Sequence, residues 1–565
     1  MANGAKLSLI WPVEREKMNS LQETVIHDLG LDVICEKVAA KPQEQGILLS
    51  VLSAMTDDPA VTRYRLEVFR DIYEHPDMCE KLMKLLDKID FLRDYGSFKD
   101  RYDEHAGVWD LMHRLEEIRD YINYVEAIYE CLRETELKSE GLGRLKNYVD
   151  TLYHERGFAE LKKDIEECRA TTASLRSVTV GINLNERFEA AGIGLISINS
   201  KPFAKSGILS NLSDAIVKNN IRPDNDWDEN YKFHPFSAGD AFAAVERFTE
   251  KRMRMNPMYT IASVPKDDSA EGVTYHMEKV TNHLLAVVIK KLKEVLKRYV
   301  YVTITDITDL IPELVYYIRF AEYVRALKDK GYVFCMPEVI QGSADTREAF
   351  AKGLWNLKLA AGCAADEIVR NDLDFDEKHR VYILTGANRG GKTTVTQAVG
   401  QLFVLAQGGI FVPAESFRFC PADRVCTHFP ADEDKTLDLG RLGEECQRFR
   451  DMFRDCGKNS LLLLNETFST TSFEEGYYIA RDSVRAILKS GIRTVYNTHM
   501  HKLAFELDDI NSGEADGMAV SLIVKSEEGK RSFRVCVAPP EGMSYARDIA
   551  VKYGVTYEML TGKEG

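Results

Sequence analysis

The sequence lacks the run of about twenty apolar residues that a membrane-spanning helix requires. Its most apolar stretch, from Tyr299 to Phe320, is interrupted by Asp306, Asp309 and Glu313. The N-terminus shows no secretory signal, because charged residues follow its short apolar patch almost at once. We therefore expect a cytoplasmic protein without a membrane span.

Paired cysteines and a basic excess are also missing. The eleven cysteines include no C-x-x-C pair, so we predict neither a zinc site nor a disulfide framework, and we expect a reducing compartment. Acidic residues outnumber basic ones, 89 against 74, which gives a formal net charge of -15. This charge argues against a protein that coats nucleic acid or an anionic membrane over its whole surface. A local basic surface stays possible.

Hydrophobic residues make up 45% of the 565 residues, which is typical of a globular chain of several domains. Apolar and charged residues recur at helical spacing through the first 170 residues, for example over 80–93 and 111–119. From Ser177, β-branched residues and glycines predict a small strand pair, and residues 204–240 are typical of loops.

Helical patterns return near Ala241 and over 311–331. Beyond about Glu367, short apolar runs alternate with helical segments, which predicts a parallel sheet in an α/β domain. The predicted fold class is therefore α plus α/β. We divide the chain into an N-terminal helical segment (1–50), a helical region (51–365) with an insertion at about 177–280, and a C-terminal α/β domain (366–565).

A phosphate-binding loop follows the first apolar run of that domain. The segment 381–394, VYILTGANRGGKTT, contains G-x-x-x-x-G-K-[ST] between a predicted strand and a predicted helix. Glycines let successive backbone N–H groups surround phosphate oxygens, and the helix N-terminus adds partial positive charge. Lys392 would contact the β- and γ-phosphates, and the Thr393 hydroxyl would hold Mg²⁺. The predicted nucleotide-binding residues of the loop are Gly386, Asn388, Gly390, Gly391, Lys392, Thr393 and Thr394.

Two further predicted strands end in polar residues. Leu461 to Leu464 lead into Asn465 and Glu466, and we predict that Glu466 is the catalytic base or orients the attacking water. Asn465 occupies the position that faces the metal, where an amide supplies an oxygen but no charge. His499 ends the next apolar run and is a second catalytic candidate, although a single histidine at a strand end is more often structural.

These motifs resemble an ABC-class ATPase, and the residues between them resemble one branch, the MutS family of mismatch-repair ATPases. TGANRGGKTT is similar to that family's TGPNxGGKST, and the segments 409–415, 461–476 and 497–499 also resemble its patterns. In the 461–476 segment, Glu466, Thr471, Ser472, Glu475 and Gly476 match. Residues 56–69 are similar to the opening of the helical lever region of small bacterial members.

The resemblance implies an ABC-type ATPase domain with a C-terminal dimerisation segment near 543–555, preceded by lever helices and a clamp. It implies ATP and Mg²⁺ as ligands, a homodimer, and double-stranded or branched DNA as a partner. Residues 369–372 match a stretch that lies against adenine in relatives, so Asn371 becomes a nucleotide-binding candidate. By this comparison the chain lacks the N-terminal mismatch-recognition domain and the Smr domain.

Three departures from the family pattern affect the site. An aspartate is expected where Asn465 stands, which predicts weak metal binding and slow hydrolysis. The segment 435–445, which in relatives completes the partner's site, matches convincingly only at Glu445. The family's G-R-G is replaced by Phe468, Ser469 and Thr470.

The sequence therefore favours an ATP-dependent DNA clamp with slow ATPase activity. DNA binding rests on analogy. Its only support in the sequence is Lys251, Arg252, Arg254 and the basic run 290–298, and such a lysine-rich helix is more often a solvated face. Two alternatives stay open: a nucleotide-gated factor that grips a ribosome or protein partner, and an ATP-binding structural switch with little turnover.

Overall fold

The structure is a computed structural model, and its described residues fall into two compact units. Unit 1 comprises residues 1–83, 135–145 and 306–565, and unit 2 comprises 84–134 and 146–305. The described residues are 7–12, 19–93, 108–172, 177–184, 186–187, 190–199, 261–262, 290, 293–295, 309–340, 347–387, 389–430, 440–513, 515, 517–527, 530–540, 551 and 553–561. The predicted loop 204–240, the helix expected near Ala241 and the three basic residues 251, 252 and 254 lie outside them. No helix among the described residues is long and apolar enough to cross a membrane.

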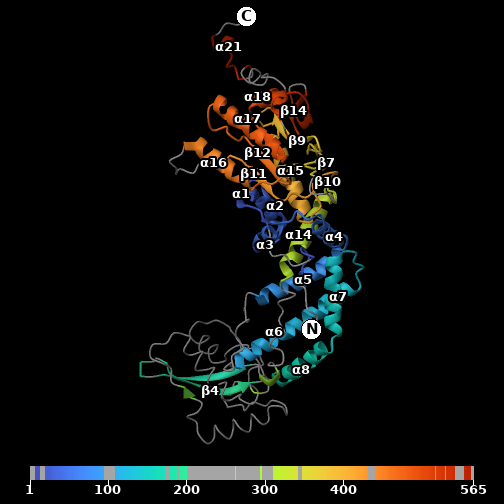
Figure 1. Cartoon of the computed structure of the whole chain (residues 1–565). Coiled ribbons are helices and arrows are strands. Elements are labelled where there is room, and N and C mark those ends of the chain that lie inside the picture. Colours follow the sequence, from blue (N-terminus) through green and yellow to red (C-terminus); the bar gives the residue numbers. More distant parts are fainter. Residues whose placement is uncertain are drawn as a thin grey trace. The chain divides into compact units, whose positions relative to one another are not determined.

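A six-stranded sheet forms the core of unit 1 (Figure 1). Its spatial order is β11 (Val425–His428), β12 (Leu461–Asn465), β13 (Arg493–Asn497), β9 (His379–Thr385), β14 (Met518–Glu527) and β15 (Lys530–Val537). The first five strands are parallel, and β15 pairs antiparallel with β14. The prediction of a parallel sheet within a mixed helical and sheet fold is confirmed.

Alternating leucines of β12 hold helices on both faces of this sheet. Leu462 and Leu464 belong to the buried cluster that includes α17 (Phe473–Ser490). Leu463 faces α15 (Lys392–Gln407), where a Cβ on Gly400 would come within 2.7 Å of the Leu463 side chain. Because side chains alternate across a strand, these contacts place α15 and α17 on opposite faces. The sheet is therefore a buried layer whose strand ends can present polar groups.

A second, four-stranded sheet lies in the same unit. Its order is β6 (Glu338–Val339), β10 (Ser416–Phe419), β7 (Ala349–Leu354) and β8 (Asn371–Phe375). The remaining elements of unit 1 that lie wholly within it are β1 (Asn19–Ser20), α1 (Glu23–Leu29), α2 (Leu31–Val38), α3 (Pro42–Leu52), β2 (Ala54–Met55), α4 (Pro59–Glu74), α14 (Ile311–Asp329), η3 (Leu357–Ala361), α16 (Gly440–Asp455), α18 (His501–Phe505), α19 (Leu507–Asn511) and α21 (Tyr557–Thr561). The sequence patterns did not predict this sheet.

The N-terminal helices pack against the sheet-bearing part of unit 1. Gln397 and Gln401 of α15 donate hydrogen bonds to the carbonyls of Asp28 and Leu29, at 2.7 and 2.9 Å. A Cβ on Gly400 would also come within 2.5 Å of Leu29, so this close approach requires glycine. These contacts hold helix α1 against the middle of α15, more than one turn after its N-terminus.

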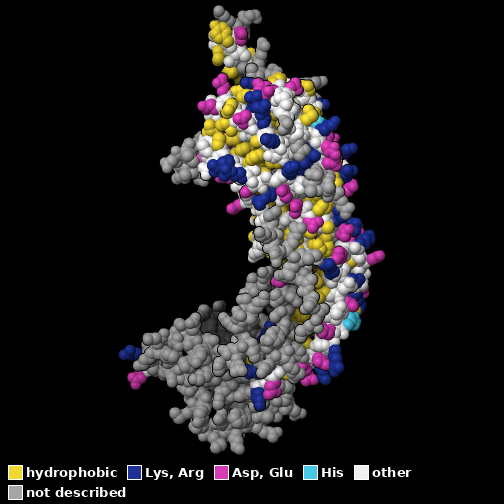
Figure 2. Space-filling model, viewed as in Figure 1, with side chains coloured by type: hydrophobic (Ala, Val, Ile, Leu, Met, Phe, Trp, Pro, Cys, Tyr) yellow, Lys and Arg dark blue, Asp and Glu magenta, His cyan; other side chains and the backbone are white. Residues whose placement is uncertain are grey.

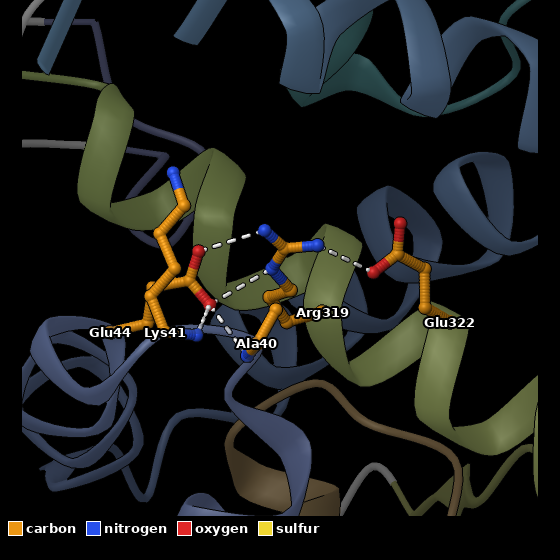
Figure 3. Close-up of polar contacts among 5 residues, drawn as sticks. All are labelled: Ala40, Lys41, Glu44, Arg319 and Glu322. Carbon is orange, nitrogen blue, oxygen red and sulfur yellow. Dashed lines mark hydrogen bonds and ion pairs between the residues drawn. The ribbon is translucent and has the colours of Figure 1, made fainter. Parts of the chain in front are cut away.

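A buried ion pair joins α3 to α14 (Figure 3). Both carboxylate oxygens of Glu44 accept hydrogen bonds from Arg319, at 2.8 and 3.0 Å, and the Arg319 guanidinium also pairs with Glu322 at 2.9 Å. Glu44 additionally accepts a hydrogen bond from the backbone N–H of Ala40 at 2.8 Å. A bidentate pair with further donors satisfies the charges that burial would otherwise leave unpaired.

Unit 2 contains α6 (Val108–Arg133), α8 (Arg156–Thr172), β3 (Ser177–Leu184), β4 (Ala190–Asn199) and β5 (Ile261–Ala262). The helices α5 (Pro76–Arg93) and α7 (Glu140–His154) have residues in both units. Strands β3 and β4 pair antiparallel, which confirms the predicted strand pair that begins at Ser177.

Candidate nucleotide site

A cavity of about 630 Å³ opens at the carboxyl ends of the parallel strands in unit 1. Its wall combines the phosphate loop, the residues that follow β12 and β13, the loops around η3 and β8, and one residue of β15. The lining residues that the argument uses are Asn371, Arg389, Gly390, Gly391, Lys392, Thr393, Thr394, Glu466, His499 and Phe533. The volume is that of a site for a small organic ligand.

The phosphate loop has the backbone that its glycines predict. Gly386 and Gly391 have φ angles of 139° and 89°, and Gly391 caps the N-terminus of α15. A Cβ on Gly390 would lie 2.9 Å from the Ala387 carbonyl oxygen, so only glycine fits there. A glycine-rich turn that leads into a helix N-terminus is suited to an anion. Asn388 lies outside the described residues.

Lys392 is held against the loop by its own chain. Its Nζ donates to the carbonyl oxygens of Gly386 and Ala387, at 3.0 and 3.2 Å, and the residue is 5% exposed. Burial lowers the pKa of Lys392, and the nearby Glu466 carboxylate partly offsets this effect. Within the described part of the chain, the hydrogen bonds of the Lys392 ammonium go to these two neutral carbonyls and not to a carboxylate, so an incoming phosphate would add a charge-assisted contact.

Three polar side chains meet where β12 and β13 end beside the loop. Thr393 Oγ1 donates to Asn465 Oδ1 at 3.1 Å, and the Asn497 amide donates to Thr393 Oγ1 at 3.2 Å and also to Asn465 Oδ1. The strand register places Asn465 opposite Asn497. The Asn497 Oδ1 is buried without a hydrogen-bond partner among the described residues. This group of oxygens fits a hydrated Mg²⁺ in donor type but offers no carboxylate.

Glu466 and His499, the two catalytic candidates, face each other across this edge. His499 Nε2 and Glu466 Oε1 lie 2.6 Å apart, and the hydrogen bond from His499 lowers the pKa of Glu466. The backbone N–H of Glu466 donates to the carbonyl of Asn497 at 2.8 Å. The structure therefore brings Lys392, Thr393, Glu466 and His499 together around one cavity, and Asn465 adjoins it through its hydrogen bond with Thr393.

Comparison with known protein families matches two parts of the chain. The model "MutS domain V" matches residues 382–550, and the model "MutS2 N-terminal domain" matches residues 57–330. The two matches do not overlap and include most of the described residues of both units. Over both matched regions the chain is therefore similar to MutS-type proteins.

Several MutS-family relatives align with part of the chain. The protein "Endonuclease MutS2" of Thermus thermophilus is 29% identical over 199 residues, which are 35% of this chain and 26% of the relative. "DNA mismatch repair protein MutS" of Chlorobium chlorochromatii is 30% identical over 199 residues, 35% of this chain and 22% of the relative. The same-named protein of an Exiguobacterium species is 34% identical over 149 residues, 26% and 18% of the two chains. The alignments thus span about a quarter or less of these relatives.

Phe468, which replaces a glycine of the MutS-family pattern, adopts a glycine-like backbone. Its φ is 64°, in the left-handed region that favours glycine. The side chain is 1% exposed and packs on Phe449 of α16, with ring centroids 5.2 Å apart. Burial of the ring therefore compensates for a backbone conformation that costs a bulky residue about 1–3 kcal/mol. Glycine is also required at Gly476, which matches the family pattern, because a Cβ added there would lie 2.4 Å from the Phe468 carbonyl oxygen.

The side-chain amide of Asn371, a predicted nucleotide contact, bonds to β15. Its Oδ1 accepts from the Val535 N–H at 2.8 Å, and its amide donates to the Phe533 carbonyl at 3.3 Å. Asn371 lines the cavity, yet its polar atoms fix the strand that carries Phe533. Phe533 is 44% exposed, and its ring lies 3.3 Å from the position of a Cβ on Gly391. Its place over the loop was not predicted, because no local pattern shows which strand crosses the cavity.

The basic run 290–298 and the segment 435–445 are only partly described. Within the basic run 290–298, the described Lys290 is exposed and Lys293 is half-buried, and the other basic residues of the run lie outside the described residues. Of the segment 435–445, residues 435–439 lie outside the described residues, and Glu445 is buried in unit 1. Thr471 donates to Glu475 at 2.6 Å on the surface of α17.

Proposed function

We propose that this protein is an ATP-dependent, DNA-binding MutS-like clamp in which ATP binding and slow hydrolysis drive closure of a homodimer on DNA. The observation that carries the proposal is the single cavity that joins a phosphate loop, a buried lysine, the Thr393 hydroxyl and a carboxylate paired with histidine. These groups have the functions that phosphoryl transfer requires: phosphate binding, metal binding and orientation of water. Cytoplasmic location accompanies the proposal.

The residues of the cavity suit distinct steps in hydrolysis. Lys392 and the loop N–H groups would bind the β- and γ-phosphates, and Gly386, Gly390, Gly391 and Thr394 would shape that contact. Glu466, kept ionised by His499, would accept a hydrogen bond from water and orient it toward the γ-phosphate. His499 would lie on the same side and hold the carboxylate in place. The cavity beyond η3 has room for the nucleoside, with Asn371 supporting its wall through β15.

Mg²⁺ would be held by Thr393 and Asn465. A bound divalent cation supplies positive charge to the phosphate oxygens. Asn465 and Asn497 contribute neutral amides at this position, and a neutral hydrogen bond is roughly half as strong as a charge-assisted one. Slow turnover follows from that weakness, and the same feature favours a nucleotide-binding switch over a fast ATPase.

Dimer formation would use the apolar side chains exposed on unit 1 (Figure 2). Phe473, Tyr478 and Phe505 are 53%, 66% and 57% exposed near the N-terminus of α17 and on α18. Tyr557 and Leu560 of α21 are 70% and 69% exposed. Exposed apolar groups of this kind mark interaction surfaces when they gather together. Similarity to proteins named for DNA mismatch repair supports DNA as the partner.

Nucleotide-dependent binding to DNA tests the proposal. We expect the purified protein to shift branched or mismatched duplexes in an electrophoretic assay only with ATP and Mg²⁺, and Lys392→Ala to remove both ATP binding and the shift. Lys378→Ala, an exposed lysine of the β8–β9 turn, is the control. Equal binding to structured RNA, or binding only to ribosomes, would support the assembly-factor alternative. Nucleotide binding by Lys392→Ala at wild-type affinity would contradict the assignment of the loop.

A further inference from the structure

The turn that carries Glu466 contains two non-glycine residues with left-handed backbone. Glu466 has φ 53° and Phe468 has φ 64°. Non-glycine residues keep such conformations only where surrounding contacts hold them. The direction of the Glu466 side chain depends on this backbone, so whatever fixes the turn also fixes the carboxylate against His499.

Glu445 of α16 supplies contacts that hold this turn. Its Oε1 accepts a hydrogen bond from the Phe468 N–H at 2.7 Å, and its Oε2 accepts one from Thr470 Oγ1 at 2.6 Å. Glu445 is 8% exposed and is not among the residues that line the cavity within the described part of the chain. Both carboxylate oxygens of Glu445 therefore accept charge-assisted hydrogen bonds from the turn, at the second and fourth residues after Glu466.

A second set of contacts holds Thr467 from the neighbouring strands. Tyr496 Oη of β13 donates to the Thr467 carbonyl at 2.7 Å, and His428 Nδ1 of β11 lies 3.0 Å from Thr467 Oγ1. Arg448, one turn along α16 from Glu445, donates to His428 Nε2 at 3.2 Å. Helix α16 thus contacts the turn directly through Glu445 and indirectly through His428.

We propose that Glu445 is a positioning residue for the catalytic carboxylate, and that helix α16 controls ATP turnover by holding the turn 466–470 in its strained conformation. The inference rests on the proposed ATPase function and adds a residue that no sequence motif assigned to this role. Release of Glu445 lets Phe468 return to an ordinary backbone conformation, which rotates Glu466 away from His499. Nucleotide binding does not change, because the phosphate loop and Lys392 lie on other elements.

Substitution of Glu445 separates positioning from folding. We expect Glu445→Ala to lower kcat at least about ten-fold while KM for ATP and the affinity for a fluorescent ATP analogue change less than about two-fold, since only the charge-assisted bonds to the turn are lost. Glu445→Gln keeps an acceptor for the Phe468 N–H, so its kcat should recover to within about three-fold of wild type. Glu444→Ala removes the neighbouring carboxylate of the same helix and is the control.

Thr470→Val tests the same contact without changing α16, and keeps the test decisive if Glu445→Ala does not fold. We expect it to lower kcat by about three-fold at unchanged ATP affinity, and hydrogen exchange of the 466–470 amides to rise in both Thr470→Val and Glu445→Ala. Equal kcat in Glu445→Ala and Glu444→Ala, or an affinity that falls in parallel with kcat, would overturn the inference alone. A wild-type protein without any ATP turnover would overturn the proposed function and the role of Glu445 with it.

Discussion

The carboxylate of Glu466 is the group whose removal should separate nucleotide binding from hydrolysis. Glu466→Gln keeps the size and shape of the side chain, but its amide cannot act as a base, so we expect ATP affinity to be retained and turnover to fall at least about a hundred-fold. The hydrogen bond from His499 lowers the pKa of Glu466. The wild-type base should therefore stay ionised, and its contribution to turnover should be lost only as the pH falls through that lowered pKa.

A steady-state ATPase assay across pH, with Glu474→Gln as the control, checks this expectation. Glu474 is an exposed carboxylate in the first turn of α17 and does not line the cavity among the described residues. A Glu466→Gln variant that hydrolyses ATP as fast as the control would show that another group orients the water.

Asn465 leads to a prediction of increased activity. Its Oδ1 already accepts hydrogen bonds from Thr393 and Asn497, so an aspartate would keep both contacts and add the charge. We expect Asn465→Asp to lower the Mg²⁺ concentration for half-maximal hydrolysis and to raise turnover, by a shift of about 1 kcal/mol. ATPase titrations against Mg²⁺ at fixed ATP measure both effects. Identical curves for the two proteins would mean that Asn465 does not act on the metal.

Some site residues could be predicted from the sequence because their chemistry lies in short contiguous motifs. Lys392 and Thr393 follow from one loop pattern, and Glu466 follows from a polar residue at the end of an apolar strand. The contacts of Asn497 depend instead on the register between β12 and β13. Those of Glu445 depend on the packing of α16 against a turn more than twenty residues away, and neither relation is visible in a local pattern.

At the scale of elements, the apolar strands of the main sheet were predictable and the second sheet was not. Leu461 to Leu464 are all buried, and such a continuous apolar run is typical of a parallel strand covered on both faces. Strands β6 and β10 have only two and four residues, too few for a periodic pattern to identify. Their pairing depends on contacts between segments that are distant in the sequence.

The ion pair between α3 and α14 should contribute measurably to stability. The side chains of Glu44 and Arg319 are 8% and 12% exposed, and Arg319→Ala would leave the Glu44 carboxylate buried without its partner. We expect a loss of about 3 kcal/mol in the free energy of unfolding at neutral pH. Glu322→Gln breaks the more exposed Arg319 pair, in which Glu322 is 42% exposed, and should cost about 1 kcal/mol or less. Denaturant titrations of the two variants compare these values.

The same pair should make stability depend on pH in the acid range. Burial favours the neutral form of Glu44, but the hydrogen bonds from Arg319 and Ala40 outweigh this effect. The pKa of Glu44 in the folded protein is therefore lowered. A lowered folded-state pKa means that the stabilisation is complete above the unfolded value and is lost as the pH falls through the folded value. The difference in the free energy of unfolding between wild type and Glu44→Gln should therefore become smaller below about pH 4. A constant difference across pH would contradict this assignment.

At the scale of the whole molecule, the division into units does not follow the order of the chain. The match to the MutS2 N-terminal domain, over 57–330, includes residues of both units, whereas the match to MutS domain V, over 382–550, lies within unit 1. Sequence patterns predicted the helical and α/β textures but not that the first helices, α1 to α4, belong to the same unit as the nucleotide cavity. Hydrogen bonds between residues some 370 positions apart, such as that from Gln401 to the Leu29 carbonyl, hold these helices in unit 1.

Nucleotide state should set the oligomeric state of the protein. A ligand that binds the closed dimer more tightly than the monomer shifts the equilibrium toward the dimer by its difference in affinity. Since Glu466→Gln should slow hydrolysis and so prolong the ATP-bound state, we expect this variant to form dimers with ATP and Mg²⁺ and to remain largely monomeric with ADP. Mass photometry or analytical ultracentrifugation measures this difference. Lys392→Ala in the same background removes ATP binding and should abolish the shift. Dimers of equal abundance with ATP, with ADP and without nucleotide would show that the protein is a constitutive dimer. ATP would then have to act on the clamp within a dimer that has already formed.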